Sequence, residues 1–480
     1  MPMRLTPTPL PLRVMPSVTA PIRKVAHVFA LVAYDSDYGE HALARRRFDN
    51  ATSFSMIDLF EQSKDGLAHG TPRPLVDWPR SPTIDIDDAN AGICGATEAC
   101  AAMNAHVATA FHDLSTLAGR LGMALEEAKY ASAARAVATT IFANLTGRGA
   151  ECEPAAEACV LDNLKRNSSV VHSTIFPLAL DHALAPGSPP RESYLAFLRA
   201  RYYHGDNVTA RASPWATGFM LRGLLGMALE SSNVTAVLDA ADFAHEVLTS
   251  RGPHSWIAMM DRHNATMTME AWSAASGSGT MSHPWNAAPA EVIPRHLMGL
   301  RPLEPAFRRV LMAPVFSRRL QHAALRVPTL GGVFELNVTL SSLRATADVA
   351  IPGNSQAQVC LPMYAVSGAE RMDTAHQLTV DGKGVVVIRR GSTLCTDVGP
   401  GRHAVVGTLK PTAHLTPNIR DPCITYNKTQ CAAVSPPLGF ECCGTACNDG
   451  CKGPPICQEC PRVAVGLPLQ DTAMTSSNKQ

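Results

Sequence analysis

Much of the first 300 residues has apolar side chains at the three- and four-residue spacing of amphipathic helices. Stretches rich in Pro, Gly and Asn separate these segments, as expected where helices end. Because helices joined by short loops lie antiparallel, we expect packed helical hairpins over residues 24–305. The expected helices are 96–121, 124–145, 174–185, 192–203, 214–230, 234–249 and 284–300.

The pattern changes near Pro305, after which short segments rich in Val and Leu alternate with Gly and Pro. This is typical of an all-β domain, and we predict an antiparallel β-sandwich over residues 306–410. Its strands carry no cluster of acids, so we expect no catalytic residue in it. The expected strands are 308–315, 324–327, 333–340, 344–351, 357–361, 377–380, 384–389 and 403–409.

Both ends of the chain differ from these two domains. Residues 1–23 are rich in Pro and are expected to form an unstructured leader. Residues 411–463 are rich in Cys, and residues 464–480 form a polar tail. The domain organisation is therefore a leader, a helical domain, a β-sandwich, a small Cys-rich module and a tail.

Eight of the fourteen cysteines lie between Cys423 and Cys460, in a segment without His. This density predicts a small module held by disulfides, whose connectivity the spacing does not determine. Zinc is the alternative, because Cys457 and Cys460 form a CxxC pair. Two further local pairs could also form disulfides, namely Cys94 with Cys100 and Cys152 with Cys159.

Composition excludes several classes of function. The formal net charge of +1 gives no electrostatic reason to bind nucleic acid or an anionic membrane. The longest uncharged apolar run near the start, residues 25–34, is too short to span a bilayer. No Gly-rich phosphate loop is present, and we predict neither a cofactor nor a catalytic metal.

Half of the sixteen Asn residues stand in N-x-S/T sequons, where about two sequons would arise by chance. This enrichment predicts a glycoprotein that is secreted or lies in the lumen of the secretory pathway. The N-terminus, however, has no apolar signal-peptide core, so we expect the beginning of the protein to lie outside this chain. The sequons are at Asn50, Asn144, Asn167, Asn207, Asn233, Asn264, Asn337 and Asn427.

The segment 266–294 carries the candidate chemistry. Glu270 stands among Trp256, Trp272, His283 and Trp285. Indole faces stack on the apolar face of a pyranose while polar side chains bind its hydroxyls, so this mixture indicates a sugar site. The alternative is a partly buried aromatic cluster at a helix start, with an incidental acid.

Two runs in this segment resemble the general-base motif of the α-L-rhamnosidases. In that family a T-x-W-E-x-W-like run precedes S-H-P-W-G-A-A-P, and here residues 266–272 read TMTMEAW and residues 282–289 read SHPWNAAP. Met269 replaces an aromatic residue and Asn286 a glycine, and the carboxylate is retained. Further similar segments extend the resemblance to roughly residues 25–410, namely 75–79, 299–308 and 327–334.

The resemblance implies an (α/α)6 toroid followed by a β-sandwich, and hydrolysis of terminal non-reducing α-L-rhamnose with inversion. Glu270 would then be the general base. Asp77 would bind a sugar hydroxyl or cap a turn, and Trp78 would stack on the sugar or pack in the core. Trp256 would line the site or anchor the barrel. His283 would donate a hydrogen bond near the base or only pack.

The resemblance also implies an acidic, Arg-containing motif upstream of the D-W-P sequence at residues 77–79, which would carry the general acid. We find no such motif there, so we expect the toroid to be N-terminally incomplete and this chain to show little activity on that account. Two functions therefore stay open. One is a rhamnosidase that acts on a rhamnose-containing glycoside or polysaccharide. The other is a secreted carbohydrate-binding or structural glycoprotein without catalysis.

Overall fold

The structure is a computed structural model of the 480-residue chain, which divides into two units, Met1–Leu409 and Lys410–Gln480. Asp77, Trp78, the leader 1–23 and the tail 464–480 lie outside the described residues. The residues described are 65–69, 99–149, 152, 156–162, 171–180, 191–204, 207–208, 210–272, 280–341, 344–364, 377–408, 425–427, 440–443 and 456–461.

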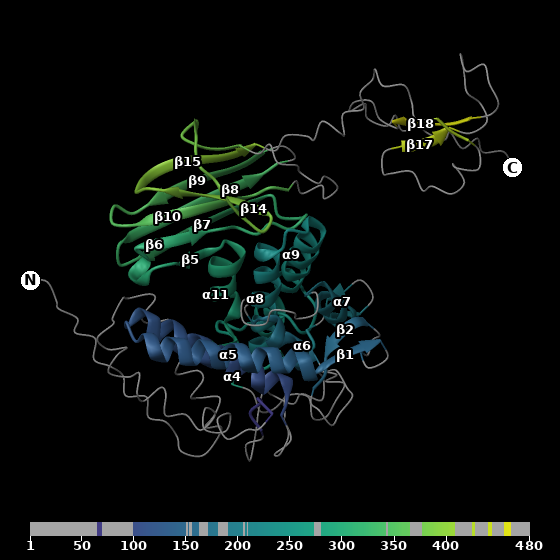
Figure 1. Cartoon of the computed structure of the whole chain (residues 1–480), viewed down its shortest axis with the longest axis vertical. Helices are drawn as coiled ribbons and strands as arrows, with labels where there is room; N and C mark the ends of the chain where they lie inside the picture. The colour runs from purple at the N-terminus through teal and green to yellow at the C-terminus, as the bar shows by residue number, and fades with distance from the viewer. Residues whose placement is uncertain are drawn as a thin grey trace, which may run out of the picture. The chain divides into compact units, whose positions relative to one another are not determined.

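The first helices form a hairpin, which Figure 1 shows side by side. Helix α4 spans Ala101–Arg120 and α5 spans Ala124–Asn144. Gly122 lies in the turn between them with φ of 72°, which a residue with a Cβ adopts at a cost. The two helices pack through apolar faces, with the rings of Phe111 and Tyr130 stacked at 6.1 Å.

A second hairpin follows the shorter helices α6 (Val171–Leu178) and α7 (Arg191–Tyr202). Its helices, α8 (Pro214–Glu230) and α9 (Val234–Thr249), have the predicted bounds. Side-chain caps explain this agreement. The Ser213 hydroxyl accepts a hydrogen bond from the Ala216 N–H, and the Asn233 side chain accepts two from the first turn of α9.

Aromatic rings join the helices into one core. The ring of His106, on α4, lies 4.4 Å from that of Phe176, on α6, and 5.7 Å from that of Trp215, on α8. Phe219, one turn along α8 from Trp215, completes the group. Since ring pairs at these separations add to the free energy of burial, this group stabilises the packing of three helices.

The prediction of one helix over residues 284–300 is wrong. The structure has a 3-10 turn η3 (Pro284–Asn286), a short α11 (Ala288–Val292) and a π-helical turn η4 (Ile293–Leu297). Prolines recur every five residues here, and each removes a backbone donor, so a regular helix cannot form. The sequence patterns also missed helix α10 (Trp256–His263) and the hairpins β1–β2 (Thr146–Gly149, Ala156–Val160) and β3–β4 (Tyr203–His204, Asn207–Val208). The expected Cys152–Cys159 disulfide is present.

Two sheets form the β-sandwich, which Figure 1 shows beside the helices of the same unit. Strand β10 of one sheet contacts β9 and β15 of the other. The first sheet has the order β13-β14-β10-β6-β5, with strands Ile388–Arg390, Thr393–Val398, Gln356–Pro362, Arg309–Met312 and Leu300–Pro302. The second has the order β12-β11-β15-β9-β8-β7, with strands Lys383–Gly384, Gln377–Val380, Gly401–Thr408, Arg344–Ile351, Gly332–Leu340 and His322–Thr329.

The mixed helical and β fold class is therefore confirmed, with one local correction. Strands β6 and β10 pair in parallel, whereas we expected antiparallel strands throughout. Parallel neighbours need a long crossover, and strands β7, β8 and β9 supply it from the other sheet. Strand β14 had not been predicted at all.

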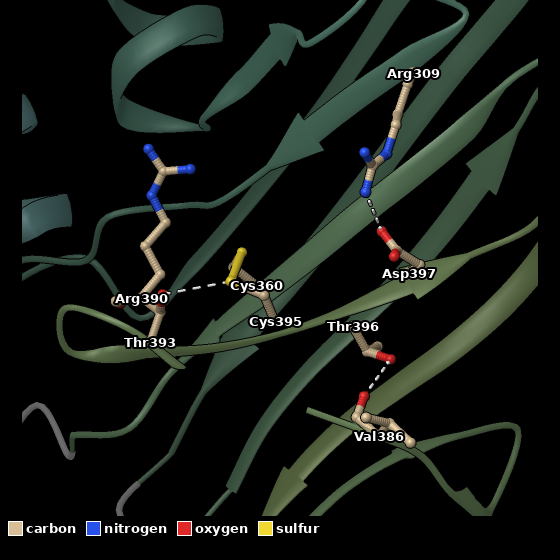
Figure 2. Close-up of a disulfide and its surroundings, with 8 residues drawn as sticks. All are labelled: Arg309, Cys360, Val386, Arg390, Thr393, Cys395, Thr396 and Asp397. Atoms are coloured by element: carbon tan, nitrogen blue, oxygen red, sulfur yellow. Dashed lines mark hydrogen bonds and ion pairs between the residues drawn. A yellow bond between two sulfur atoms is a disulfide. The ribbon is translucent and has the colours of Figure 1, made fainter. Parts of the chain in front are cut away.

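A disulfide and an ion pair connect strands of the first sheet (Figure 2). Cys360 on β10 and Cys395 on β14 are direct register partners, buried, and joined by a disulfide. Arg309 on β6 donates to Asp397 on β14 at 2.9 Å, across β10. These links hold three neighbouring strands together independently of the backbone ladder.

The helical part of the chain passes into the first sheet at Gly299. This residue has φ of 67°, and a Cβ built there would lie 2.1 Å from the carbonyl oxygen of Ala313. The Ala313 N–H donates to the Gly299 oxygen at 3.3 Å, and the Val315 N–H donates to the Leu297 oxygen at 2.8 Å. We call residues 297–315 the junction.

The segment after the junction is fixed to α9. The Arg318 guanidinium donates to Asp239 at 2.9 Å and to Asp242 at 2.5 Å, and its backbone N–H also donates to Asp242. Arg319 forms an ion pair with Glu246 on the same helix. Several charge-assisted hydrogen bonds at one place are stronger than isolated surface pairs, so the helices and the sandwich are joined at a second point.

The carboxyl group of Asp113, on α4, has a raised pKa, which makes the stability of the fold depend on pH. Burial raises the pKa of its carboxyl from 3.8 to about 7, and the charge of Arg120 opposes this only in part. The folded state therefore binds more protons than the unfolded state between these values, so stability falls as pH rises through this window. We expect Asp113→Asn to raise the free energy of unfolding by on the order of 2 kcal/mol at pH 8 and to leave it unchanged at pH 4. Urea titrations at the two pH values measure this, and an equal effect at both would contradict it.

The second unit contains the strands β16 (Thr425–Asn427), β17 (Phe440–Cys443) and β18 (Ile456–Pro461), in the order β16-β18-β17. The state of its eight cysteines stays a prediction. Among the described residues of the whole chain, no helix is both long and apolar enough to cross a membrane.

Candidate active site

The two runs that resemble the general-base motif lie against each other. The Glu270 N–H donates to the Thr280 carbonyl at 2.9 Å, and the His283 N–H donates to the Thr268 carbonyl at 2.7 Å. The Thr268 hydroxyl returns a hydrogen bond to the His283 carbonyl at 2.8 Å. Residues ten to fifteen positions apart are thereby held side by side, and both runs contribute to one site.

Glu270 is held between buried neighbours. Met269, Ala271 and Trp272 are all buried, whereas the Glu270 side chain is 18% exposed. The Thr280 N–H donates to Oε2 of Glu270 at 2.8 Å. A hydrogen bond from a backbone N–H to a carboxylate oxygen is charge-assisted, so this contact holds the side chain in one orientation.

His283 lies next to the carboxylate. Its Nδ1 is 3.9 Å from Oε2 of Glu270 and 3.3 Å from the Thr280 hydroxyl. The imidazole ring meets the Trp285 ring edge to face at 6.0 Å, and Trp285 is 52% exposed. A carboxylate, an imidazole and an accessible indole thus lie together, which is the mixture expected of a sugar site.

Trp256 and Trp272 are buried residues of the same part of the chain, and their rings meet edge to face at 5.0 Å. The Trp256 indole N–H donates to the Asn286 carbonyl at 2.8 Å, and that of Trp272 donates to the Ala212 carbonyl at 2.7 Å. The contacts of Trp256 suit a residue that anchors the barrel, which is the second of the two roles expected for it. Contact of Trp256 with a sugar stays a prediction.

The sequence patterns did not single out Asn286 as functional. Its side chain is buried and donates to the carbonyls of Met269, at 2.7 Å, and of Glu270, at 2.8 Å. The only sequence signal was its departure from the glycine of the motif that it resembles. Thr280, which binds the carboxylate, carried no signal, because its position depends on the fold of the intervening chain.

The structure therefore brings together Glu270 and His283, and Trp256 is linked to them through its hydrogen bond to Asn286. Asp77 and Trp78 lie outside the described residues. In the described part of the chain no three His, Cys, Asp or Glu side chains converge as metal ligands do. A partly exposed carboxylate fixed by an N–H donor can accept a proton from water, which is the task of a general base.

Two family models match the chain. Residues 4–297 match the bacterial alpha-L-rhamnosidase 6 hairpin glycosidase domain, and residues 299–375 match the bacterial alpha-L-rhamnosidase C-terminal domain. The first match includes Glu270, His283 and Asn286, and it covers more than half of the chain. The boundary between the two matches falls in the junction, where the helical part passes into the first sheet.

Individual relatives agree with these matches. An alpha-L-rhamnosidase of Alteromonas sp. (strain LOR) is 24% identical over 156 residues, which are 31% of this chain and 16% of the relative. The chain is also similar to an alpha-L-rhamnosidase structure from Dictyoglumus thermophilum, with TM-score 0.58, 15% identity and coverage of 80% of this chain and 39% of that one. The alpha-L-rhamnosidase of Streptomyces avermitilis, complexed with L-rhamnose, gives TM-score 0.54 at 16% identity, with 80% of this chain and 32% of that one covered.

The structural similarity shows a shared fold, and the chain spans well under half the length of each of these relatives. The family itself is established by the match over residues 4–297. The chain belongs to the α-L-rhamnosidase family of six-hairpin glycoside hydrolases.

Proposed function

We propose that this protein hydrolyses terminal non-reducing α-L-rhamnose residues with inversion, and that Glu270 is the general base. One observation carries the proposal. Within the matched glycosidase domain, Glu270 is a partly exposed carboxylate fixed by the Thr280 N–H and flanked by His283. Family membership supplies the substrate class, because its members are alpha-L-rhamnosidases.

In this mechanism Glu270 takes a proton from water as the water oxygen attacks the anomeric carbon. The bond to the leaving oxygen breaks on the opposite face of the sugar, and that oxygen takes a proton from a general acid. Inverting glycosidases place their two carboxyl groups about 6.5–9.5 Å apart to leave room for the water. The Thr280 N–H keeps Oε2 in place while the carboxyl group gains its proton.

The sugar-binding residues are proposals as well. His283 is the side chain best placed to donate to a hydroxyl beside the base, because its ring lies 3.9 Å from the carboxylate. We propose that Asp77 and Trp78 complete the sugar site, on the strength of the resemblance of residues 75–79 to a barrel loop. The structure in complex with L-rhamnose among the relatives supports rhamnose as the bound sugar.

An activated substrate tests this function. Dinitrophenolate leaves without protonation, so dinitrophenyl α-L-rhamnoside requires only the base half of the mechanism. We expect turnover of this substrate, with β-L-rhamnose as the first product in proton NMR spectra recorded before mutarotation. α-L-Rhamnose as the first product would exclude inversion. Rhamnose binding without any turnover would favour the alternative, a carbohydrate-binding glycoprotein without catalysis.

We also propose that the protein passes through a secretory lumen. Four sequon asparagines of the described residues have exposed side chains, and the disulfides Cys152–Cys159 and Cys360–Cys395 lie in the described part of the first unit. Enzymatic removal of N-glycans from the protein isolated from its native source should therefore lower its mass. An unchanged mass would argue against this location. The four are Asn144, Asn233, Asn264 and Asn337.

A further inference from the structure

Asn286 joins three segments that surround the proposed base. Its side-chain Nδ2 donates to the carbonyls of Met269 and Glu270, at 2.7 and 2.8 Å. Its backbone carbonyl accepts the indole N–H of Trp256 at 2.8 Å, and its backbone N–H donates to the His283 carbonyl at 3.0 Å. One buried residue thus contacts helix α10, the base segment and the His283 turn.

The two side-chain contacts have a specific geometric consequence. The Met269 carbonyl belongs to the peptide plane before the Glu270 α-carbon, and the Glu270 carbonyl belongs to the plane after it. Because peptide units are planar, fixing both planes fixes the two backbone dihedrals of Glu270 and hence the direction of its Cα–Cβ bond. The amide has two N–H donors, and each has a carbonyl to bind.

We propose that Asn286 is a positioning residue that aims the Glu270 carboxylate at the attacking water. This inference rests on the proposed role of Glu270 as general base. The Thr280 N–H fixes one end of the carboxylate, and Asn286 fixes the backbone from which the side chain starts. Misplacement of a reacting group by about 1 Å can cost on the order of 10²-fold in rate, so the clamp acts on turnover.

A purely structural role is the competing explanation, and the chain supplies a matched control for it. Asn104, on α4, is also buried, and its Nδ2 donates to the carbonyls of Ala68 and Cys100 at 3.1 and 3.0 Å. Its loss leaves the Ala68 carbonyl without its donor and the Ala68 N–H, now 2.7 Å from Oδ1, without its acceptor, while the Cys100 carbonyl keeps the Asn104 backbone N–H. Like the loss of Asn286, it removes two hydrogen bonds that connect separate segments through one buried amide. Asn104→Ala therefore measures the effect of removing such a clamp from a segment to which no part of the mechanism is assigned.

The experiment compares steady-state hydrolysis of dinitrophenyl α-L-rhamnoside by the full chain and its variants, at a temperature where each is folded. Asn286→Ala should lower kcat by about 10- to 100-fold and leave KM within about twofold. Asn104→Ala should lower the melting temperature and leave kcat unchanged. Asn286→Leu, which has a similar volume, no charge and neither donor, should show the same kcat loss and serves if the alanine variant does not fold.

A double-mutant cycle with Glu270→Gln separates positioning from structure. If Asn286 acts only through the carboxylate, adding Asn286→Ala to Glu270→Gln should change the residual rate by less than about twofold. Multiplicative losses in the cycle would overturn the proposal, and so would a normal kcat in Asn286→Ala. Full activity of Glu270→Gln would instead overturn the proposed function, so the two failures are distinguishable. A wild-type chain without turnover would overturn both.

Discussion

Replacing Glu270 with Gln should slow hydrolysis of dinitrophenyl α-L-rhamnoside by about 10²–10⁴-fold, the usual cost of losing a general base. Glutamine retains the shape and can still accept the Thr280 N–H, but it cannot take a proton from water. Since the substitution changes a group that acts on the water rather than on the sugar, the Kd for L-rhamnose should change little. Steady-state kinetics and titration calorimetry measure the two quantities separately.

Glu291 supplies the matched control. It is a second partly buried glutamate in the same region, where it binds Arg222 at 2.9 Å and His296 at 3.2 Å. Burial raises the pKa of its carboxyl, but the hydrogen bond to His296 and the charge of Arg222 outweigh this and lower it to about 2. Its stabilising contribution is therefore present above pH 4.5 and is lost as pH falls toward 2.

Glu291→Gln should therefore reduce stability at pH 7 without the rate loss expected of Glu270→Gln. Two results would contradict the assignment of the base. One is near-normal turnover by Glu270→Gln. The other is an equal loss of turnover in both variants, which would indicate that the region responds to any lost carboxylate rather than to a catalytic one.

Removing the Cys360–Cys395 disulfide should lower the free energy of unfolding by about 4 kcal/mol, because it closes a loop of 35 residues. The two cysteines are register partners and both are buried, so Ala at the two positions would also lose some packing (Figure 2). The variant Cys360→Ser with Cys395→Ser keeps the volumes closer to those of the thiols. Urea unfolding of this variant and of the parent, without reductant, measures the difference.

The Cys152–Cys159 disulfide is the internal comparison. It spans only seven positions, so the same loop-closure argument predicts a smaller loss, about 2.3 kcal/mol. If removing either disulfide lowered the free energy of unfolding equally, loop closure would not explain the stabilisation by Cys360–Cys395. A sandwich that keeps its stability without Cys360 and Cys395 would show that the ladder and the Arg309–Asp397 pair hold these strands unaided.

Local signals made part of the fold predictable. Helices α8 and α9 have the predicted bounds because Ser213 and Asn233 cap their first turns, and both caps are visible in the sequence. Strand β9 likewise has the predicted bounds, since alternate residues along it are buried. The prediction of a helix over residues 284–300 failed because a local signal was outweighed. The apolar spacing of this segment suited a helix, but three evenly spaced prolines divided it into turns of different pitch.

The candidate site was predictable only where a motif carried it. Glu270 and His283 stand in runs with recognisable residue types, and the structure places them 3.9 Å apart. The contacts that orient Glu270 come from Asn286 and Thr280, sixteen and ten positions away. No periodicity or propensity encodes such contacts, because they depend on how the chain returns to itself. The burial of Trp256 also depends on tertiary packing, so the sequence did not determine whether this side chain lines the site or anchors the barrel.

The contact at Gly299 has a consequence for how this protein could be recombined. Any side chain there would meet the backbone of Ala313, so the chain that enters the first sheet at Gly299 lies directly against the segment that follows β6. A sandwich from another family member could be grafted only if the whole junction, residues 297–315, were transplanted with it as one piece. A cut at the boundary between the two family matches would keep Gly299 with Ala313 but would separate Leu297 from Val315, whose backbones share a hydrogen bond.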